Sequence, residues 1–382
     1  MISPLLRGCA WRAACLLGAG VLSWPAAVWS GPAPAPASPF SIAGSTPPAP
    51  PPISGAPFSM AGTTPPPVTA PVPDRDLNQW LLRLHSASSR RNYVGTFVVM
   101  SGAGNMYSSR IWHVCEGDLQ MERVDALTGP ARSTFRRNDQ VITFLPDARV
   151  ARSEKRESLG LFPNLKRAGD PALAALYQAQ SGAVDRVAGF DADVVHIQPK
   201  DNLRYGYRIW SEKKSGLAIK IQTLDADGKV LEQAAFSELD LDANVKMDKL
   251  AQMMNNTSGY KVEHAELVKT TPQQEGWALK SPVAGFQPVS CYRRSQGNPT
   301  VVGPGPAPAP TLQWTFSDGL ATVSLFIEPY DRQPHPQDEV QVSMGATQTL
   351  ARRWGNDWWL TMVGEVPLAT LKLFAQNLER RK

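Results

Sequence analysis

The chain has 382 residues, of which 42% are hydrophobic and 19% are charged, and its formal net charge is +5 at pH 7. This length is enough for more than one domain with a sizeable core. The mild charge, to which Arg7 and Arg12 contribute near the start, lacks the concentrated basic face that nucleic-acid binding requires, so no nucleic-acid partner is expected.

Residues 1–30 have the organisation of a secretory signal peptide. Arg7 and Arg12 form a basic start, and an apolar stretch follows at 13–24. Val28-Trp29-Ser30, with its smaller residues on either side of Trp29, precedes a cleavage point before Gly31. The apolar stretch is well short of the ~20 residues that span a membrane. We therefore expect an exported protein.

Two cysteines, Cys115 and Cys291, remain after residue 30. An oxidising compartment permits a disulfide, but isolated cysteines are more often buried apolar groups, so their pairing is left open.

Residues 31–73 are rich in proline and carry no charged residue, and PFSIAGSTPP at 39–48 recurs as PFSMAGTTPP at 57–66. Such a segment cannot bury enough apolar surface to offset its ordering entropy. We predict a disordered spacer here.

A large domain is predicted over 74–240. It opens with a helix at 76–88, capped by Asp76, with Leu77, Trp80, Leu81 and Leu84 on one stripe. A second helix is predicted at 170–182, with Asp170 as cap and Gly182 after its end.

The rest of this domain consists of short β-type runs separated by turn residues, the pattern of an antiparallel meander. Apolar residues occupy both faces of the run at 93–100, so both sides of the sheet need cover. The predicted fold is mainly β (α+β): a curled antiparallel half-barrel around helices, with an apolar groove where the helices do not fill the curve.

Residues 241–265 are predicted to be a linker, and 266–382 a smaller C-terminal α+β domain. Its strands end in an amphipathic helix at 365–382, opened by Pro367, and a Gly/Pro-rich loop lies between Arg294 and Thr311.

No catalytic, cofactor-binding or metal-binding motif is found. His113 and Cys115 share one face of a predicted strand, but a metal site needs further ligands. A strand histidine beside a buried cysteine is the favoured interpretation, and the sequence indicates a binding protein rather than an enzyme.

From about residue 77 to 382 the chain resembles the RseB/MucB family of periplasmic sigma-E regulators. The matching stretches are NYVGTFV (92–98), the His-Val-x-Glu-Gly run at 113–117, ERVDALTGPAR (122–132), the run at 185–220 that contains RYGYRIW, FSDGLATVSLFIEP (316–329) and VGEVPLATLK (363–372).

This resemblance implies a large domain similar to the lipoprotein carriers LolA and LolB and a smaller C-terminal domain. It also implies binding to the periplasmic part of an RseA/MucA-like anti-sigma factor, protection of that factor from a DegS-type protease, and release by lipid or lipopolysaccharide fragments. It brings no cofactor and no catalytic residue. The alternative is a lipid or lipoprotein carrier in its own right, and the oligomeric state, a homo-oligomer included, is left open.

Two sets of candidate contacts follow. Large rings on neighbouring strands, Phe97, Trp112 and Phe144, are predicted to line the lipid groove. Candidates for contact with the partner or an anionic ligand are Arg204, Arg208, Arg352, Arg353 and Trp358. For Arg204 and Arg208 the alternative is pairing with carboxylates such as Asp185 or Asp201, and for the residues at 352–359 it is a small-domain core with a hairpin at Gly355-Asn356.

Overall fold

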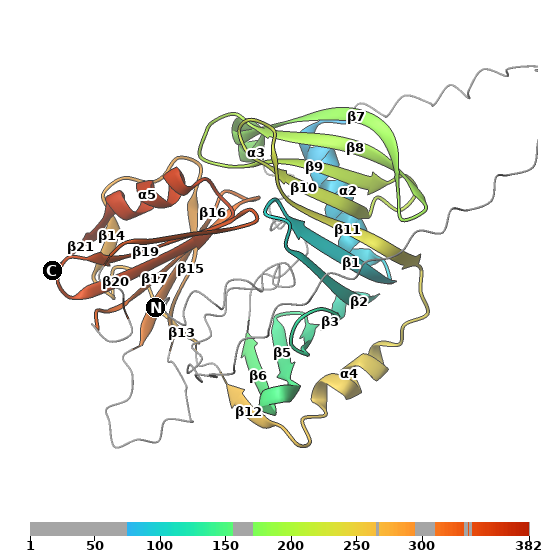
Figure 1. The fold of residues 1–382 in the computed structure, drawn as a ribbon, viewed down its shortest axis with the longest axis horizontal. Helices are drawn as coiled ribbons and strands as arrows, with labels where there is room; N and C mark the ends of the chain where they lie inside the picture. Colours follow the sequence, from blue (N-terminus) through green and yellow to red (C-terminus); the bar gives the residue numbers. More distant parts are fainter. Residues whose placement is uncertain are drawn as a thin grey trace, which may run out of the picture. The chain divides into compact units, whose positions relative to one another are not determined.

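The computed structural model describes residues 75–155, 171–264, 267–294, 310–331, 335 and 338–381. The expected signal peptide (1–30), the expected spacer (31–73) and nearly all of the loop between Arg294 and Thr311 lie outside these residues. Two large, mainly antiparallel sheets dominate the described part (Figure 1). The mainly β fold predicted from the sequence is confirmed.

The first sheet has twelve strands in the order β12-β6-β5-β4-β3-β2-β1-β11-β10-β9-β8-β7. Their bounds are β1 (Tyr93–Ser101), β2 (Met106–Glu116), β3 (Leu119–Ala126), β4 (Ser133–Arg137), β5 (Gln140–Leu145), β6 (Val150–Lys155), β7 (Tyr177–Val187), β8 (Phe190–Pro199), β9 (Gly206–Glu212), β10 (Ala218–Leu224), β11 (Val230–Leu241) and β12 (Lys261–His264). Neighbours pair antiparallel except β12, which runs parallel to β6.

Helix α2 (Leu77–Arg90) covers strands β7 to β10 of this sheet. Asp76 caps it by accepting the Gln79 amide proton, and the Gln79 side chain accepts from the Asp76 amide, which completes a capping box. Its apolar stripe, Leu77, Trp80, Leu81 and Leu84, is buried against Val195, Ile197, Tyr207 and Ile209. The helix predicted at 76–88 is confirmed.

The predicted helix at 170–182 is only half correct. Helix α3 (Pro171–Leu176) ends after six residues, and β7 begins at Tyr177. Tyr177 and Ala179 pack in the core with a period of two and pair with Pro199 and Ile197 on β8. Tertiary pairing therefore overrides a helix-favouring local sequence.

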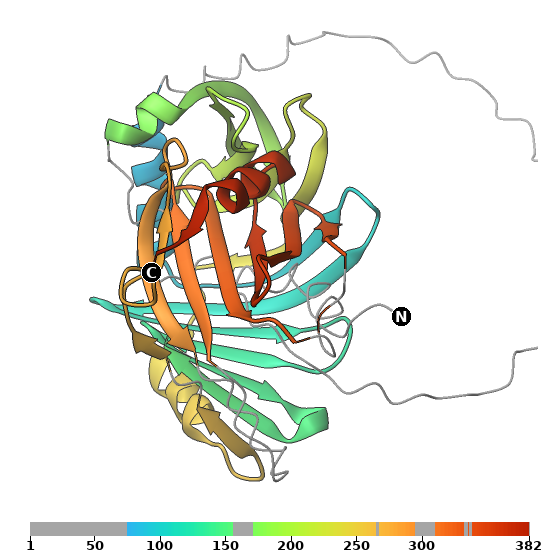
Figure 2. The same ribbon diagram turned by 90° about the vertical axis from the view of Figure 1, so that its left-hand side faces the viewer.

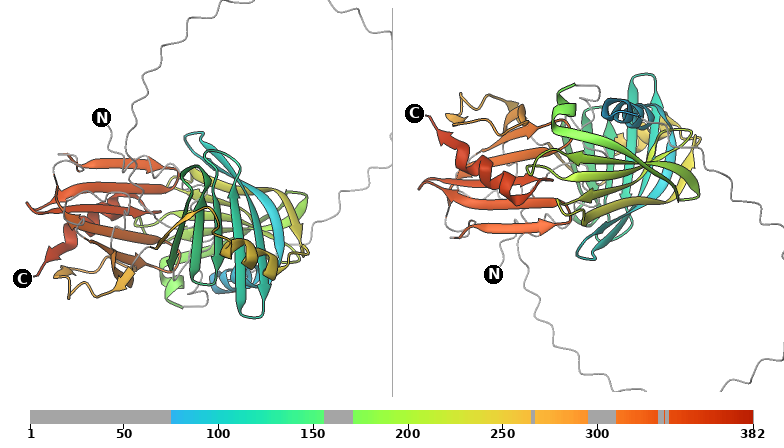
Figure 3. Two further views of the ribbon diagram at one scale, coloured as in Figure 1. Left: turned by 90° about the horizontal axis from the view of Figure 1, so that it is seen from below. Right: turned by 90° about the horizontal axis from the view of Figure 1, so that it is seen from above.

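The stretch expected to be a linker, 241–265, contains ordered elements of the first sheet. Helix α4 (Met247–Asn255) lies across β2 and β3, as the left view of Figure 3 shows, and β12 extends the edge beside β6. Met247, Leu250 and Met254 recur at the spacing of one helical face and are buried there. The mixed composition hid this short apolar stripe.

The second sheet has seven strands in the order β13-β15-β16-β17-β20-β19-β18. Their bounds are β13 (Leu267–Lys269), β15 (Gln287–Arg294), β16 (Thr311–Ser317), β17 (Thr322–Pro329), β18 (Val340–Met344), β19 (Thr347–Trp354) and β20 (Trp358–Gly364); β14 (Trp277–Leu279) pairs with β21 (Leu378–Arg380). Helix α5 (Leu368–Asn377) follows Pro367 and buries Leu371 and Phe374 against one face of the sheet (Figure 2). The predicted final helix is confirmed in part, because the chain becomes strand β21 at Leu378.

Cys115 and Cys291 are both free thiols. Within the described ranges, the helices are all too short or too polar to cross a bilayer.

Candidate functional site

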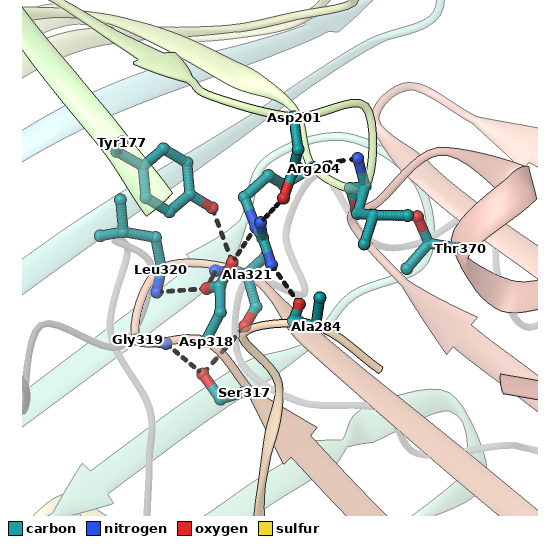
Figure 4. A network of polar contacts seen from close by, with 11 residues as sticks. Tyr177, Asp201, Arg204, Ala284, Ser317, Asp318, Gly319, Leu320, Ala321 and Thr370 are labelled. Atoms are coloured by element: carbon teal, nitrogen blue, oxygen red, sulfur yellow. Dashed lines mark hydrogen bonds and ion pairs between the residues drawn. The ribbon is translucent and has the colours of Figure 1, made fainter. Parts of the chain in front are cut away.

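A buried ion-pair network joins the two sheets, and Arg204 is at its centre (Figure 4). Arg204 lies between β8 and β9. Its Nε donates to Asp318 Oδ2 at 2.7 Å, its Nη2 donates to the Ala284 carbonyl at 2.8 Å, and its Nη1 pairs with Asp201. The side chains of Arg204 and Asp318 are fully buried. Such a pair is costly to desolvate, so it depends on complete hydrogen bonding.

Both carboxylate oxygens of Asp318 accept hydrogen bonds from several donors. Its Oδ1 accepts the backbone N–H groups of Leu320 and Ala321 at 2.8 and 2.7 Å, which fixes the turn between β16 and β17. Its Oδ2 also accepts the hydroxyl proton of Tyr177 at 2.8 Å. Burial and the neighbouring charge of Asp318 raise the pKa of Tyr177 well above its usual value, so the phenol remains a donor.

The same turn inserts a side chain into the first sheet. Leu320 is buried in the apolar cluster beneath α2, together with Trp80 and Tyr177. Thr370 of α5, which packs on the second sheet, also donates to the carbonyl of Leu203, which lies between β8 and β9, at 2.8 Å. These contacts hold the connection between β8 and β9 of the first sheet against the turn between β16 and β17 of the second sheet.

Arg204 therefore cannot present its charge to a ligand, and its prediction as a contact residue is wrong. Of the alternatives weighed from sequence, pairing with Asp201 is confirmed, whereas Asp185 accepts a hydrogen bond from Trp210 Nε1 at 2.7 Å. The dominant partner, Asp318, is 114 residues away in sequence. Arg208 is half-buried and donates to Gln222 Oε1 at 3.3 Å.

The three predicted groove residues do not share a face. Val94 pairs with Trp112 and Phe97 with Ser109 across β1 and β2. Since side chains alternate along a strand, Phe97 and Trp112 project from opposite faces of the sheet. Phe97 packs edge-on against Phe236 in a separate cluster.

Trp112 and Phe144 do lie on one face. Residues that pair across neighbouring strands share a face, and the pairs run from Trp112 through Arg123 and Phe135 to Ile142. Phe144 lies two residues beyond Ile142 on β5 and therefore projects from the same face. This face is covered by α4. The cluster consists of Val114, Met121, Phe135, Ile142, Phe144, Ala151, Met247, Leu250 and Met254, with Trp112, Met253 and Tyr260 half-buried at its margin. We call it the α4-covered surface.

The margin of the α4-covered surface carries cationic groups. Arg123 lies 4.9 Å from the centre of the Trp112 ring and Arg110 lies 5.6 Å from it. Arg123 also pairs with Asp125 at 2.6 Å, whereas Arg110 makes a long, exposed ion pair with Glu238 at 3.5 Å and donates to Thr96 Oγ1 at 3.5 Å. An apolar surface beside an exposed cation has the chemistry to hold an acyl chain attached to an anionic group.

The other candidates lie in the second sheet. Arg352 and Arg353 are exposed on β19; Arg352 pairs with Glu339 at 3.2 Å, and Arg353 stacks 4.5 Å over the ring of Tyr330. Trp358 packs inside this unit, 5.3 Å from Trp277, beneath the guanidinium of Arg380. The hairpin expected at Gly355-Asn356 connects β19 to β20, where Trp354 pairs with Trp358.

Sequence reasoning missed a second buried ionic cluster, on β2, β3 and β4. His113 Nδ1 lies 2.9 Å from Glu122 Oε1, and its Nε2 lies 3.0 Å from the Cys115 sulfur. Arg136 donates to Glu122 Oε2 at 3.0 Å, and Tyr93 stacks on the His113 ring at 4.9 Å. Both ring nitrogens of His113 are thus engaged within the protein. In the described part of the chain, no group of three or more His, Cys, Asp or Glu side chains is placed to hold a metal ion.

Comparison with known proteins gives a consistent family. The MucB/RseB N-terminal domain model matches residues 76–254, and the MucB/RseB C-terminal domain model matches 271–379. The chain is 29% identical to the sigma factor AlgU regulatory protein MucB of Pseudomonas aeruginosa over 311 residues, which cover 79% of this chain and 90% of that protein. It is 25% identical to the sigma-E factor regulatory protein RseB of Haemophilus influenzae over 316 residues, 82% of this chain and 94% of that protein.

Solved structures agree. The complex of Pseudomonas aeruginosa MucA and MucB contains a chain with 27% identity and a TM-score of 0.60, covering 80% of this chain and 99% of that chain. A crystal structure of MucB with MucA(peri) gives 26% identity and a TM-score of 0.59.

Proposed function

Because the chain belongs to the MucB/RseB family, whose curated members are sigma-factor regulatory proteins, we propose that it is a periplasmic regulator that binds an RseA/MucA-like anti-sigma factor. The observation that carries this proposal is the pair of solved relatives that hold MucA and that match this chain across both sheets. The secretory character of residues 1–30 supports the location.

Binding alone suffices for regulation of this kind. A segment of the anti-sigma factor held on the protein is withheld from a DegS-type protease, so the rate of cleavage follows the unbound fraction. No catalytic group is required. The proposed role is protection of the anti-sigma factor, and hence repression of a sigma-E-type envelope-stress response.

Titration calorimetry with the periplasmic segment of the cell's own anti-sigma factor tests the first step. Cleavage of that segment by a DegS-type protease, with and without the protein, tests the second. Absence of binding by the intact protein would overturn the proposal.

We further propose that a lipid or lipopolysaccharide fragment releases the anti-sigma factor from the protein by binding the α4-covered surface. Three methionines of α4, Met247, Met253 and Met254, pack on or beside this surface. Methionine side chains are unbranched and adapt to different apolar shapes, so α4 can repack around an acyl chain. Each buried methylene contributes about 0.8 kcal/mol, and a few methylenes are enough for the coupling. If lipid lowers affinity for the anti-sigma segment, the segment lowers affinity for lipid by the same factor.

Phe144→Leu is expected to weaken binding of a fluorescent single-chain acyl probe several-fold, because Phe144 is a buried member of the α4-covered surface and contacts Phe135 and Tyr260 edge-on. The matched control is Phe97→Leu. Phe97 is equally buried, at 5% exposure, but lies on the opposite face of the sheet. Both changes remove similar core volume, so loss of stability is common to both.

Fluorescence titration of the two variants decides between the faces. Equal weakening by Phe97→Leu and Phe144→Leu would show that the acyl site is not the α4-covered surface. Unchanged probe binding by both variants would contradict the proposed acyl site as well.

A further inference from the structure

Strand β18 (Val340–Met344) is the outermost strand of the second sheet. It pairs with β19 on one side, and no described residue pairs with its other side. An edge of this kind offers a row of backbone N–H and C=O groups to an added strand.

The register shows which groups face outward. Gly345 and Ala346 form a two-residue turn, with Gly345 at φ 59°, and Met344 pairs with Thr347 across it. The pair that closes a two-residue hairpin is hydrogen-bonded, and hydrogen-bonded pairs alternate along an antiparallel ladder. Val342 and Val340 therefore bond to β19, whereas the backbone groups of Gln341 and Ser343 point away from the sheet.

This edge lacks the usual protection against pairing. The sequence VQVSM contains no charged residue and no proline, and its register with β19 is continuous. The edge strand β7 of the first sheet is different: it has a register shift between Ser181 and Val184 and carries Asp185 and Arg186. Exposed sheet edges are normally blocked by such features, so an unblocked edge indicates a binding strand.

The side chains around β18 define the chemistry of that strand. Val340, Val342 and Met344 are half-buried and share one face of the edge. Gln341 and Ser343 are exposed on the other face. Gln341 pairs with Leu350 of β19, and Arg352 lies two residues beyond Leu350, so the Arg352 side chain projects from this face as well. The Arg352 side chain is 46% exposed and pairs with Glu339 at the surface. A matching strand has apolar side chains on one face and at least one carboxylate on the other.

We propose that β18 binds an extended segment of the anti-sigma factor, which adds to the second sheet as an eighth strand and places an acidic side chain near Arg352. This inference rests on the proposed function and names the surface that performs it. Backbone hydrogen bonds supply affinity in this mode, and alternate side chains supply specificity.

Ser343→Pro is the direct test, with Ser343→Ala as its matched control. Proline removes the outward N–H of residue 343 and places its ring in the path of the added strand, yet it breaks no bond to β19 and is tolerated at a sheet edge. Alanine removes the side-chain hydrogen bond to Gln348 and keeps the N–H. In calorimetry with the periplasmic segment, we expect Ser343→Pro to raise the Kd about tenfold or more and Ser343→Ala to change it less than about twofold.

Equal affinity of Ser343→Pro and the parent protein would overturn the β18 site and leave the proposed function standing. Failure of the parent itself to bind the segment would instead overturn the proposed function. If Ser343→Pro abolishes self-association in sedimentation experiments but leaves segment affinity unchanged, the edge pairs with a second copy of this chain and the present inference is wrong.

Should the proline variant not fold, hydrogen exchange on the unmodified protein gives the same decision. Adding the segment is expected to slow exchange of the outward amides of Gln341 and Ser343, whereas the inward amide of Val342 changes less. Unchanged exchange at Gln341 and Ser343 in the saturated complex would contradict the added strand.

Discussion

Asp318→Ala is expected to lower the free energy of unfolding by about 3–5 kcal/mol, because it leaves the buried guanidinium of Arg204 without its main counter-charge. The same change removes the acceptor of the Tyr177 hydroxyl and of two backbone amides in the turn that carries Leu320. Urea unfolding followed by circular dichroism measures the effect.

Two further variants separate the causes. Asp318→Asn keeps an oxygen that can accept the amides of Leu320 and Ala321 but removes the charge, so its loss should be smaller than that of alanine and still exceed about 1 kcal/mol. Glu238→Ala removes an exposed carboxylate, 72% accessible, from its 3.5 Å ion pair with Arg110 and should cost less than about 1 kcal/mol. If Asp318→Ala costs no more than Glu238→Ala, the network does not hold the sheets together.

Local patterns predicted what local forces determine. Helix α2 was predictable because Asp76, Gln79 and the buried leucines all lie within one short segment. The end of α3 was not, since the pairing of Tyr177 with Pro199 competes with the helix from more than twenty residues away. The role of Arg204 depends on Asp318, and no local pattern around RYGYRIW points to residue 318.

Some features of the candidate site could likewise be predicted from the local sequence, and others could not. Opposite faces for Phe97 and Trp112 follow from the β1–β2 register, which the loop at 102–105 sets and which the sequence left undetermined. The pairing of His113 with Glu122 was within reach: Gly117 and Asp118 form a two-residue turn, and counting outward from it places these residues opposite each other. The contact of Arg136 with Glu122 could not be predicted in this way, because a longer connection separates β3 from β4.

The His113–Glu122–Arg136 cluster is expected to make stability depend on pH at both ends of the range. Burial opposes the charge on His113, but hydrogen bonds to Cys115 and Glu122 and the charge of Glu122 outweigh it and raise the pKa of His113 to about 9. Burial likewise opposes the charge on Glu122, but Arg136 and His113 lower the pKa of Glu122 to about 2. Each shift stabilises the charged form in the folded protein.

The direction of each dependence follows from linkage. The contribution of His113 is complete below its ordinary pKa of 6.5 and is lost as the pH rises through about 9. That of Glu122 is complete above its ordinary pKa of 4.5 and is lost as the pH falls through about 2.

We therefore expect the free energy of unfolding to fall by a few kcal/mol between about pH 6 and pH 10 on account of His113. Denaturant unfolding of the parent and of His113→Gln across this range measures the difference, and other groups that titrate there cancel between the two proteins. The variant should be less stable than the parent near pH 6, and the gap should narrow as the pH rises. A gap that stays constant from pH 6 to pH 10 would show that His113 is not held in its charged form.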